Sequence, residues 1–380
     1  MTDRVVHVVG ARPNFMKAGP VVKALARRGV EQLVIHTGQH YDTTMSDIFF
    51  RELDLPEPDL NLGVGSGSQA GQTAVLLTAL ESAILDLDPA LTVVYGDINS
   101  TLATALVASK LHLPTAHVEA GLRSFDMTMP EEVNRRVTDI LADLLFVTSP
   151  EAIDNLRNEG VAAERIHFVG NPMIDTLVAN LDRFDVAAAR RAYDLDGPYA
   201  VATLHRPANV DTPAAAARLV TMLASVTAQL PVVLPLHPRG RAMLARAGLV
   251  GGPRLRLVEP LGYVGFMSLV RGASVVVTDS GGIQEETTIL GVPCLTVRPN
   301  TERPITISHG TNRLVEPDEV GGWVGRILAA PPARSAVSPI VPPLWDGHAG
   351  ERIADIVVDW LADRASGSPM STKSAAPSAS

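Results

Sequence analysis

Residues 5–17, VVHVVGARPNFMK, decide the fold of this chain. Five mostly apolar residues are followed by a glycine turn and then by a segment that has helical periodicity. A short valine-rich run of this kind is typical of a strand buried on both faces of a parallel sheet. The stretch therefore predicts a strand–turn–helix unit.

The same alternation continues along most of the chain. Further strands are expected at residues 33–35, 91–95, 144–147 and 166–169, with helices at 73–85, 101–111 and 132–145. After Asn171-Pro172 the pattern pauses, and it restarts with strands at residues 199–204, 232–236, 255–258, 274–278 and 294–297. Alternating strands and helices indicate βαβ units and a parallel sheet, so two successive α/β halves share the chain.

A length of 380 residues agrees with two domains. The domain boundaries that we expect are a first α/β domain at 1–172, a linker helix at 173–197, a second α/β domain at 198–347, a final helix at 348–364 and a disordered tail at 365–380. The final helix has Ile353, Val357 and Trp360 on one apolar stripe, whereas the tail has no periodicity.

Composition excludes several classes of protein. The formal net charge of -9 argues against a nucleic-acid-binding protein. A single cysteine excludes an intrachain disulfide and a cysteine-rich metal site. No stretch approaches the ~18 consecutive apolar residues of a membrane span, and the first residues do not resemble a secretion signal. A cytoplasmic protein without a membrane partner is expected.

Charged residues gather where the strands of the first half end. Arg12 and Lys17 follow the first strand, Asp97 and Glu119 follow two later ones, and Glu131 begins the next helix. Ligands of open parallel sheets bind at the carboxyl ends of the strands. Two simpler interpretations remain open: Asp97 caps the following helix, and the neighbouring Glu132 pairs with Arg136 on a solvated helix face.

The second half has a histidine beside an arginine after one strand, His205-Arg206, and a glycine-rich turn after another, Ser280-Gly281-Gly282. A histidine there can transfer a proton near neutral pH or donate to a phosphate. Backbone N–H groups at the start of a helix form an anion site. Glu286, one turn further on, is placed to accept hydrogen bonds from a ribose diol.

Taken together, these segments resemble the non-hydrolysing UDP-N-acetylglucosamine 2-epimerases over nearly the whole chain. The resemblance rests on nine motifs in order: Gly10-Ala11-Arg12-Pro13, Thr37-Gly38-Gln39-His40, Gly96-Asp97, residues 117–123, Pro130-Glu131-Glu132, Val169-Gly170-Asn171-Pro172, His205-Arg206, residues 279–286 and Thr301-Glu302-Arg303-Pro304. It implies a GT-B-like fold, in which two Rossmann-like domains face each other across a cleft and the last helix packs back on the first domain.

The resemblance also implies roles for individual residues. The catalytic residues would be Asp97, Glu119, Glu131 and His205. The residues that bind the nucleotide sugar would be Arg12, Lys17, Phe266, Ser280, Gly281, Gly282, Glu286 and Arg303. No cofactor and no metal are implied, and a homodimer is expected.

The implied reaction is the reversible C2 epimerisation of UDP-N-acetylglucosamine to UDP-N-acetylmannosamine. UDP is eliminated to give a 2-acetamidoglucal and then adds back. Four alternatives stay open: a hydrolysing epimerase that releases N-acetylmannosamine and UDP, an epimerase of a modified UDP-N-acetylhexosamine, a glycosyltransferase of the same fold, and a UDP-sugar sensor without activity.

Overall fold

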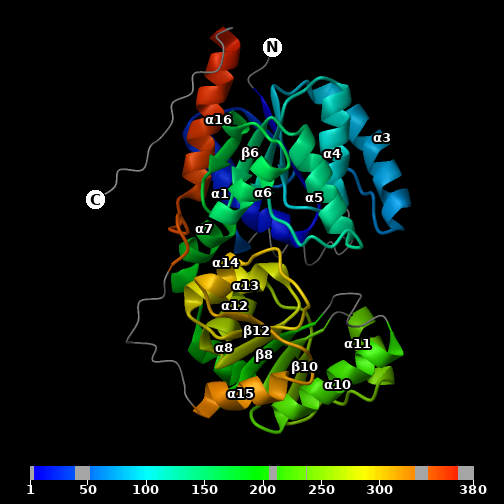
Figure 1. The fold of residues 1–380 in the computed structure, drawn as a ribbon, viewed down its shortest axis with the longest axis vertical. Coiled ribbons are helices and arrows are strands. Elements are labelled where there is room, and N and C mark those ends of the chain that lie inside the picture. The colour runs from blue at the N-terminus through cyan, green and yellow to red at the C-terminus, as the bar shows by residue number, and fades with distance from the viewer. Residues whose placement is uncertain (1–3, 39–51, 205–211, 237, 330–340, 367–380) are drawn as a thin grey trace. The chain divides into compact units, whose positions relative to one another are not determined.

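A computed structural model describes residues 4–38, 52–204, 212–236, 238–329 and 341–366. The chain divides into two compact units (Figure 1). The first unit comprises Met1–Thr176 and Leu344–Ser380, and the second comprises Leu177–Pro343. The second unit is therefore inserted, in sequence, between two parts of the first.

The first unit is built on a seven-stranded sheet in the order β3-β2-β1-β4-β5-β6-β7, and the pairings within it are parallel. Its strands are β1 (Val5–Val9), β2 (Gln32–His36), β3 (Leu60–Asn61), β4 (Leu91–Tyr95), β5 (Thr115–Ala120), β6 (Leu144–Val147) and β7 (Ile166–Phe168). Each residue of β1 is buried, as expected for a central strand of a parallel sheet. The strand order reverses between β1 and β4, so the carboxyl ends of these two strands mark the position where ligands bind in such sheets.

The helices of the first unit begin where local sequence satisfies or removes the unpaired N–H groups of the first turn. Proline opens α5 (Pro130–Leu141) and α6 (Pro150–Asn158), at a position where its missing N–H costs nothing. Ser68 caps α3 (Gln69–Leu87) by accepting from Gly71 N–H. The other helices are α1 (Arg12–Arg27), α4 (Asn99–Lys110), the 3₁₀ helix η1 (Ala163–Arg165), α7 (Pro172–Ala179) and α16 (Ala349–Ser366).

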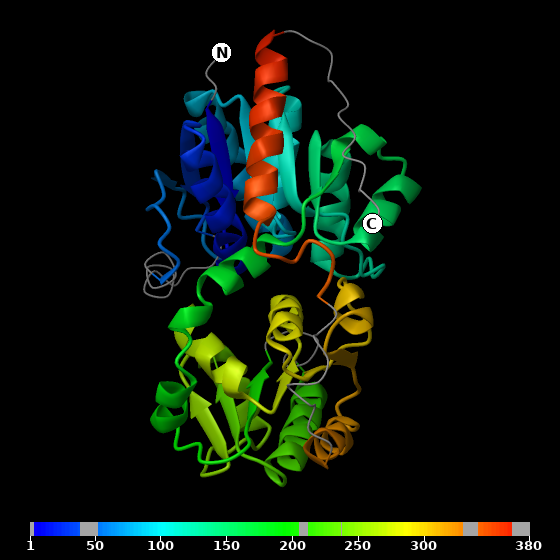
Figure 2. The same ribbon diagram turned by 90° about the vertical axis from the view of Figure 1, so that its left-hand side faces the viewer.

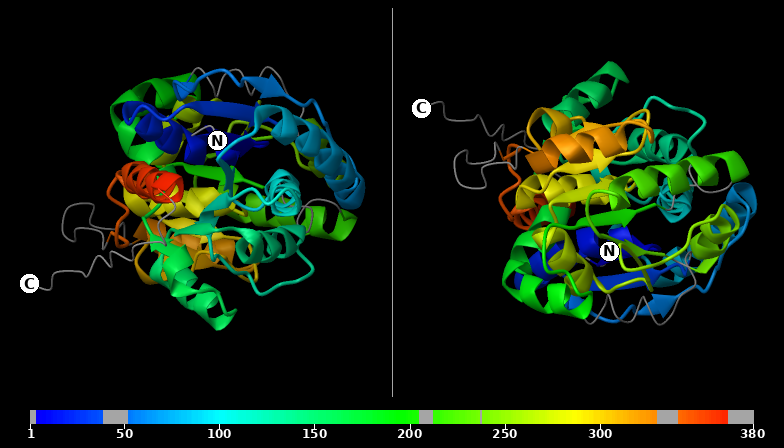
Figure 3. Two further views of the ribbon diagram at one scale, coloured as in Figure 1. Left: turned by 90° about the horizontal axis from the view of Figure 1, so that it is seen from above. Right: turned by 90° about the horizontal axis from the view of Figure 1, so that it is seen from below.

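Helix α3 has two apolar sides. One side, with Leu76, Leu80 and Ile84, is part of the hydrophobic core. On the other, Val75 and Leu85 are exposed by 54% and 60%, and the helix lies at the outer side of the first unit (Figure 3). Within the described residues, α3 is the one helix that is long and apolar enough to span a membrane by length and composition alone.

Helix α16 returns to the first unit and packs against α1 (Figure 2). A Cβ atom on Gly350 would lie 2.7 Å from the backbone of Pro20 in α1, so only glycine permits this close approach. The carboxylate of Asp175, in α7, accepts hydrogen bonds from the N–H groups of Ala349 and Gly350 at 3.1 and 2.7 Å. Helix α7, where the chain leaves the first unit, therefore caps α16, the helix with which the chain returns to that unit.

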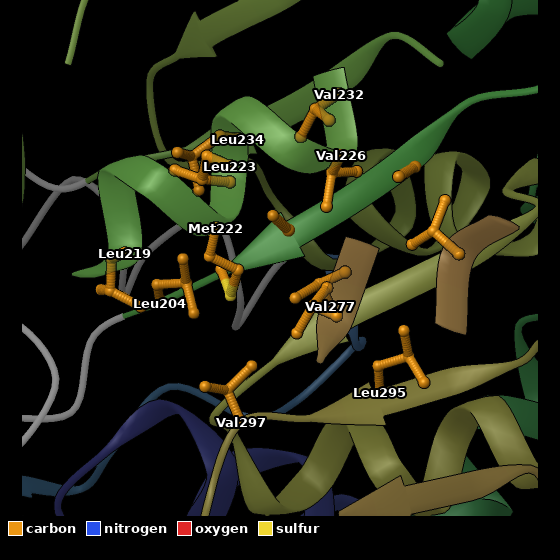
Figure 4. Packing of buried hydrophobic residues seen from close by; sticks show 14 of the residues in the cluster. Leu204, Leu219, Met222, Leu223, Val226, Val232, Leu234, Val277, Leu295 and Val297 are labelled. Carbon is orange, nitrogen blue, oxygen red and sulfur yellow. The ribbon is translucent and has the colours of Figure 1, made fainter. Parts of the chain in front are cut away.

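The second unit is built on a six-stranded sheet in the order β10-β9-β8-β11-β12-β13, again with parallel pairings. Its strands are β8 (Ala200–Thr203), β9 (Val232–Pro235), β10 (Leu255–Val258), β11 (Val275–Thr278), β12 (Cys294–Thr296) and β13 (Asn312–Leu314). Leu223 and Val226 of α10 pack with Leu234 and Val277 of the sheet in the core (Figure 4). The helices are η2 (Leu181–Arg183), α8 (Val186–Ala192), α10 (Pro213–Thr227), α11 (Pro238–Arg246), α12 (Tyr263–Gly272), α13 (Gly281–Leu290), α14 (Ile305–Ser308) and α15 (Val320–Ala329).

The α/β class, the two parallel sheets and the returning helix are confirmed, with two corrections. The linker at 173–197 is not one helix, because the chain forms α7, η2 and α8 in succession. The helix expected at 132–145 ends at Leu141, since Leu144 already belongs to β6. The predicted tail from 367 onward lies outside the described residues.

Candidate active site

Three turns meet at the carboxyl edge of the first sheet, after β1, β4 and β5. Asn14 of α1 joins the first two turns. Its side-chain oxygen accepts from the N–H groups of Gly10 and Ala11 at 3.2 and 3.1 Å, and its amide nitrogen donates to Tyr95 O at 2.8 Å. The turn that carries Asp97 is thereby tied to the turn that begins α1.

Glu119 does not follow its strand as predicted: it is the fifth residue of β5, just before the third turn, and it has an unusual backbone conformation. Its φ of 73° is left-handed, and the pairing of β5 with β6 shifts register between Val118 and Ala120. A bulge of this kind redirects a side chain at the edge of a sheet. The Glu119 carboxylate forms a buried ion pair with Lys17 Nζ. The structure thus pairs a residue predicted to be catalytic with one predicted to bind substrate.

Gly96 lies directly beside this ion pair. Its φ is 64°, and a Cβ atom there would be 2.9 Å from Lys17 Nζ and 3.1 Å from Glu119 Oε2. A side chain at position 96 would displace the pair, so glycine is required both by the backbone conformation and by the close approach.

Asp97 follows Gly96, and its carboxylate pairs with Arg135 of α5. The Asp97 side chain is 25% exposed, so it combines a fixed cationic partner with access to solvent. Ile98, not Asp97, is the N-cap residue of α4, which removes the simpler interpretation of Asp97 as a capping residue.

Glu132 differs from expectation, because it is fully buried and does not form a solvated pair with Arg136. Its Oε2 accepts from Arg135 Nη1 at 2.5 Å and from Ser124 N–H at 2.8 Å. Arg136 instead lies 3.3 Å from Glu159. Arg135 therefore bridges Glu132 and Asp97.

The other predicted residues of this edge are placed less completely. Glu131 lies in the first turn of α5 and is half-buried. Arg12 begins α1, immediately after the turn at Gly10, and its side chain is outside the described part. His205 lies outside the described residues altogether, shortly after the end of β8.

In the second sheet, the glycine-rich turn follows β11 as predicted. Ser280 is the N-cap residue of α13, and its side chain makes no capping hydrogen bond. The N–H groups of Gly281 and Gly282 belong to the first turn, which has no carbonyl partners within the helix. Together with the helix dipole they make this helix start a candidate anion site.

Arg303 extends this anion site. A Cβ atom on Gly281 would be 2.5 Å from Arg303 Nη1, so the guanidinium packs against the first turn of α13. Two buried carboxylates hold it there: Glu285 Oε1 is 3.0 Å from Nε, and Glu302 Oε2 is 3.4 Å from Nη1. Glu302 is itself fixed by Arg298, at 2.7 Å.

Glu286 is buried behind the same turn. Burial raises the pKa of its carboxyl to about 8; the adjacent Tyr263 hydroxyl opposes this shift and Glu285 adds to it. Tyr263 begins α12, which also carries the half-buried Phe266. The predicted residues Phe266, Ser280 and Glu286 thus all lie on α12 or at the start of α13.

Three residues of the first unit were missed from the sequence: Arg135, His117 and Asp139. Arg135 stands three residues after Glu132, a spacing that places two side chains on one helix face and was the available signal. His117 and Asp139 are both fully buried, and His117 contacts Asp139 and the carbonyl of Gly96. Among the described residues, no group of three or more His, Cys, Asp or Glu side chains is placed to hold a metal ion.

The chain is similar to known proteins over most of its length. A sequence profile described as UDP-N-acetylglucosamine 2-epimerase matches residues 23–358. The UDP-N-acetylglucosamine 2-epimerase of Methanocaldococcus jannaschii is 41% identical over 318 residues, which cover 81% of this chain and 87% of that protein. The UDP-2,3-diacetamido-2,3-dideoxy-D-glucuronate 2-epimerase of Pseudomonas aeruginosa is 42% identical over 316 residues, or 82% of this chain and 88% of the relative.

A solved structure is similar to this chain as well. The crystal structure of the M. jannaschii UDP-GlcNAc 2-epimerase in complex with UDP-GlcNAc and UDP superposes with a TM-score of 0.84 at 36% identity. The match covers 93% of this chain and 99% of that one.

Proposed function

Because this chain belongs to the UDP-N-acetylglucosamine 2-epimerase family, we propose that it epimerises UDP-N-acetylglucosamine at C2 reversibly, without net hydrolysis. The match over residues 23–358 supports the 2-epimerase activity itself. The finer proposal, a non-hydrolysing reaction through a glycal, rests on the chemistry of the two sheet edges.

The second unit would hold the nucleotide and stabilise the leaving group. The first-turn N–H groups of α13 and the guanidinium of Arg303 form a fixed set of donors for the diphosphate. Phe266 is proposed to lie against the uracil, and Glu286 to accept hydrogen bonds from the ribose. When the C1–O bond breaks, its electrons move to the departing phosphate oxygen, and preorganised donors lower the energy of that charge.

The first unit would move the protons. Loss of UDP gives C1 cationic character, which acidifies the C2–H bond, and a carboxylate then removes the C2 proton to leave a C1=C2 double bond. Re-addition of UDP to C1 and protonation of C2 from the opposite face complete the inversion. Two faces require two proton-transfer groups, for which Asp97, Glu119 and Glu131 are the candidates.

Fixed cations distinguish two of these candidates. Glu119 faces Lys17, and Asp97 faces Arg135. An adjacent cation favours the ionised form of a carboxylate. We propose that Lys17 and Arg135 keep these two carboxylates ionised at rest, that one of them removes the C2 proton, and that the other takes up a proton from solvent and delivers it to C2 on the opposite face. His205 is proposed to act at the diphosphate.

Turnover in heavy water tests this proposal directly. The enzyme is incubated with UDP-N-acetylglucosamine in D2O and followed by proton NMR. We expect UDP-N-acetylmannosamine that carries deuterium at C2, with recovered substrate that is labelled too. Unlabelled product would contradict the glycal route, free N-acetylmannosamine would identify a hydrolysing enzyme, and binding without exchange would identify a sensor. A glycosyltransferase would show no turnover without an acceptor.

A second substrate follows from the relative that is 42% identical, which is named for a UDP-2,3-diacetamido-2,3-dideoxy-D-glucuronate. The proposed elimination needs only the C2 proton and the C1 diphosphate, so substituents at C3 and C6 do not exclude such a sugar. A panel of UDP-sugars, compared by kcat/KM for C2 exchange, decides between the two substrates.

We also propose that the enzyme acts in the cytoplasm as a homodimer, with the exposed side of α3 as the contact. Val75 and Leu85 are exposed there, and a groove of about 400 Å³ lies between α3, α4 and α5, lined by Leu77 and Val133 among others. Burying this apolar surface against a second copy removes it from water. Light scattering of Leu85→Glu should show monomers, whereas a monomeric wild type would contradict the proposal.

A further inference from the structure

His117 lies in β5, two residues before Glu119, and its ring is fully buried. Its Nε2 is 2.7 Å from the carbonyl oxygen of Gly96. A carbonyl oxygen can only accept a hydrogen bond, so Nε2 carries a proton and donates it.

The other ring nitrogen faces a carboxylate. His117 Nδ1 is 2.7 Å from Asp139 Oδ1, and Asp139 Oδ2 accepts from Gly121 N–H at 3.1 Å and from Arg123 Nη1 at 2.7 Å. Burial by itself raises the pKa of Asp139, but the charges of His117 and Arg123 and their hydrogen bonds outweigh it and hold that pKa below its usual value. His117 is therefore held at both ring nitrogens, by Asp139 at Nδ1 and by the Gly96 carbonyl at Nε2.

The ring joins β5, which carries Glu119, to the turn that carries Asp97. Gly96 N–H donates to Val118 O at 3.0 Å, while Gly96 O accepts from His117. The N–H and C=O groups of Gly96, whose φ is left-handed, are thus both hydrogen-bonded to β5. Asp97 follows immediately, and Glu119 lies within 3.1 Å of the position that a Gly96 Cβ would take.

We propose that His117, oriented by Asp139, is a positioning residue that fixes Asp97 relative to Glu119. The inference rests on the proposed function, because that function gives the two carboxylates their roles at C2. Misplacement of a reacting group by about 1 Å costs on the order of a hundredfold in rate, so a rigid connection between β5 and the turn at Asp97 has a large kinetic effect.

Two amide variants separate the two hydrogen bonds of His117. The side-chain nitrogen of asparagine takes the place of Nδ1, and that of glutamine takes the place of Nε2. His117→Gln therefore retains the donor to Gly96, whereas His117→Asn loses it. We expect His117→Asn to lower kcat for C2 exchange at least tenfold with KM within about threefold. His117→Gln should keep kcat within about threefold of wild type.

A buried histidine on the same sheet provides the matched control. His7 Nε2 lies 2.9 Å from Gln32, and burial lowers its pKa to about 4, so it is a neutral, structural residue. His7→Gln should lower the denaturation midpoint but leave kcat of the folded enzyme unchanged. Equal kcat in His117→Asn and His117→Gln, or wild-type kcat in His117→Asn, would overturn the proposal.

The hydrogen bond to Gly96 is tested without any activity assay. In wild-type enzyme with ¹⁵N-labelled histidine, Nε2 of His117 should give a protonated signal, assigned by its loss in His117→Gln. An Nε2 without a proton would overturn the proposal even if the enzyme epimerises its substrate. Absence of C2 exchange in wild type would instead refute the proposed function and leave the hydrogen bond to Gly96 in place.

Discussion

The two sheets of this protein share a strand order but differ in what they carry at the carboxyl edge. In the first sheet the end of β2-β1-β4-β5 carries side chains that form ion pairs, Glu119 with Lys17 and Asp97 with Arg135. In the second, the corresponding β9-β8-β11-β12 ends in a helix N-terminus that offers backbone N–H groups. The shared strand order therefore determines where each edge can bind a ligand, and the residues around the turns determine which chemistry that edge can perform.

The cations of the two edges also serve different purposes. Lys17 and Arg135 each face a carboxylate that the proposed reaction uses for proton transfer. Arg303 faces Glu285 and Glu302, which are buried and hold the guanidinium against Gly281. We infer that charge in the first edge sets the state of the bases, whereas in the second it positions a donor. Substitutions at the first edge should thus lower kcat, and substitutions at the second edge should weaken the binding of the nucleotide.

The largest expected effect is on the first edge. Glu119→Gln removes the ionised carboxylate while keeping its shape, so kcat for C2 exchange should fall by about 10²–10⁴-fold with KM little changed. Steady-state kinetics by NMR measure both constants. Calorimetric titration with UDP is the control, since affinity for the leaving group should stay near that of wild type. A kcat within threefold of wild type would remove Glu119 from the chemistry.

Arg303→Lys tests the second edge. Lysine keeps the positive charge but loses the planar set of donors, so the dissociation constant of UDP should rise roughly ten- to a hundredfold. Isothermal titration calorimetry measures this directly. If kcat at saturating substrate falls more than the affinity does, the division of labour between the two edges is wrong.

Gly281→Ala is a subtler change at the same edge. The new methyl group would lie 2.5 Å from Arg303 Nη1 and force the guanidinium to move. Overpacking of this kind costs about 1 kcal/mol or more, which corresponds to a rise of roughly fivefold in the dissociation constant of UDP. Gly322→Ala in α15 is the matched control, because nothing lies within 4 Å of its Cβ position. Equal affinities in the two variants would contradict the packing argument.

The raised pKa of Glu286 should make the free energy of unfolding depend on pH. Its pKa is raised from 4.5 to about 8 in the folded protein, so the folded state resists its ionisation. The contribution of the protonated Glu286 to the free energy of unfolding is fully present below pH 4.5 and is lost as the pH rises toward about 8. Urea denaturation between pH 5 and 8 should show a smaller decline for Glu286→Gln than for wild type. Parallel curves would mean that Glu286 is ionised in the folded protein at neutral pH.

The strands were the part of the fold that could be predicted best. β1, β4 and β6 begin and end where the apolar runs do, because these parallel strands are fully buried. The half-buried edge strand β10 also has the predicted bounds. β13 (Asn312–Leu314) was missed since it is three residues long and contains two polar ones. The return of the last helix to the first unit followed from the family resemblance and not from the pattern, whereas the strand order and the packing of α16 on α1 were not predicted.

The candidate site could be predicted as a set of turns but not as a set of contacts. Which cation faces Asp97 depends on how α5 packs beside β4, and Arg135 is 38 residues away in sequence. Glu132 looked like a surface residue because its neighbours are charged. It is buried because the N–H groups of Ser124 and Phe125 need an acceptor.

The cap that Asp175 places on α16 bears on biosynthesis. A ribosome delivers Met1–Thr176 first, then the whole of Leu177–Pro343, and α16 only afterwards. At roughly 5–20 residues per second, the inserted unit alone occupies the ribosome for about ten to thirty seconds. Throughout this interval the N–H groups that Asp175 accepts from do not yet exist, and the Pro20 side of α1 lacks its covering helix. The first unit to be synthesised is therefore the last to be completed.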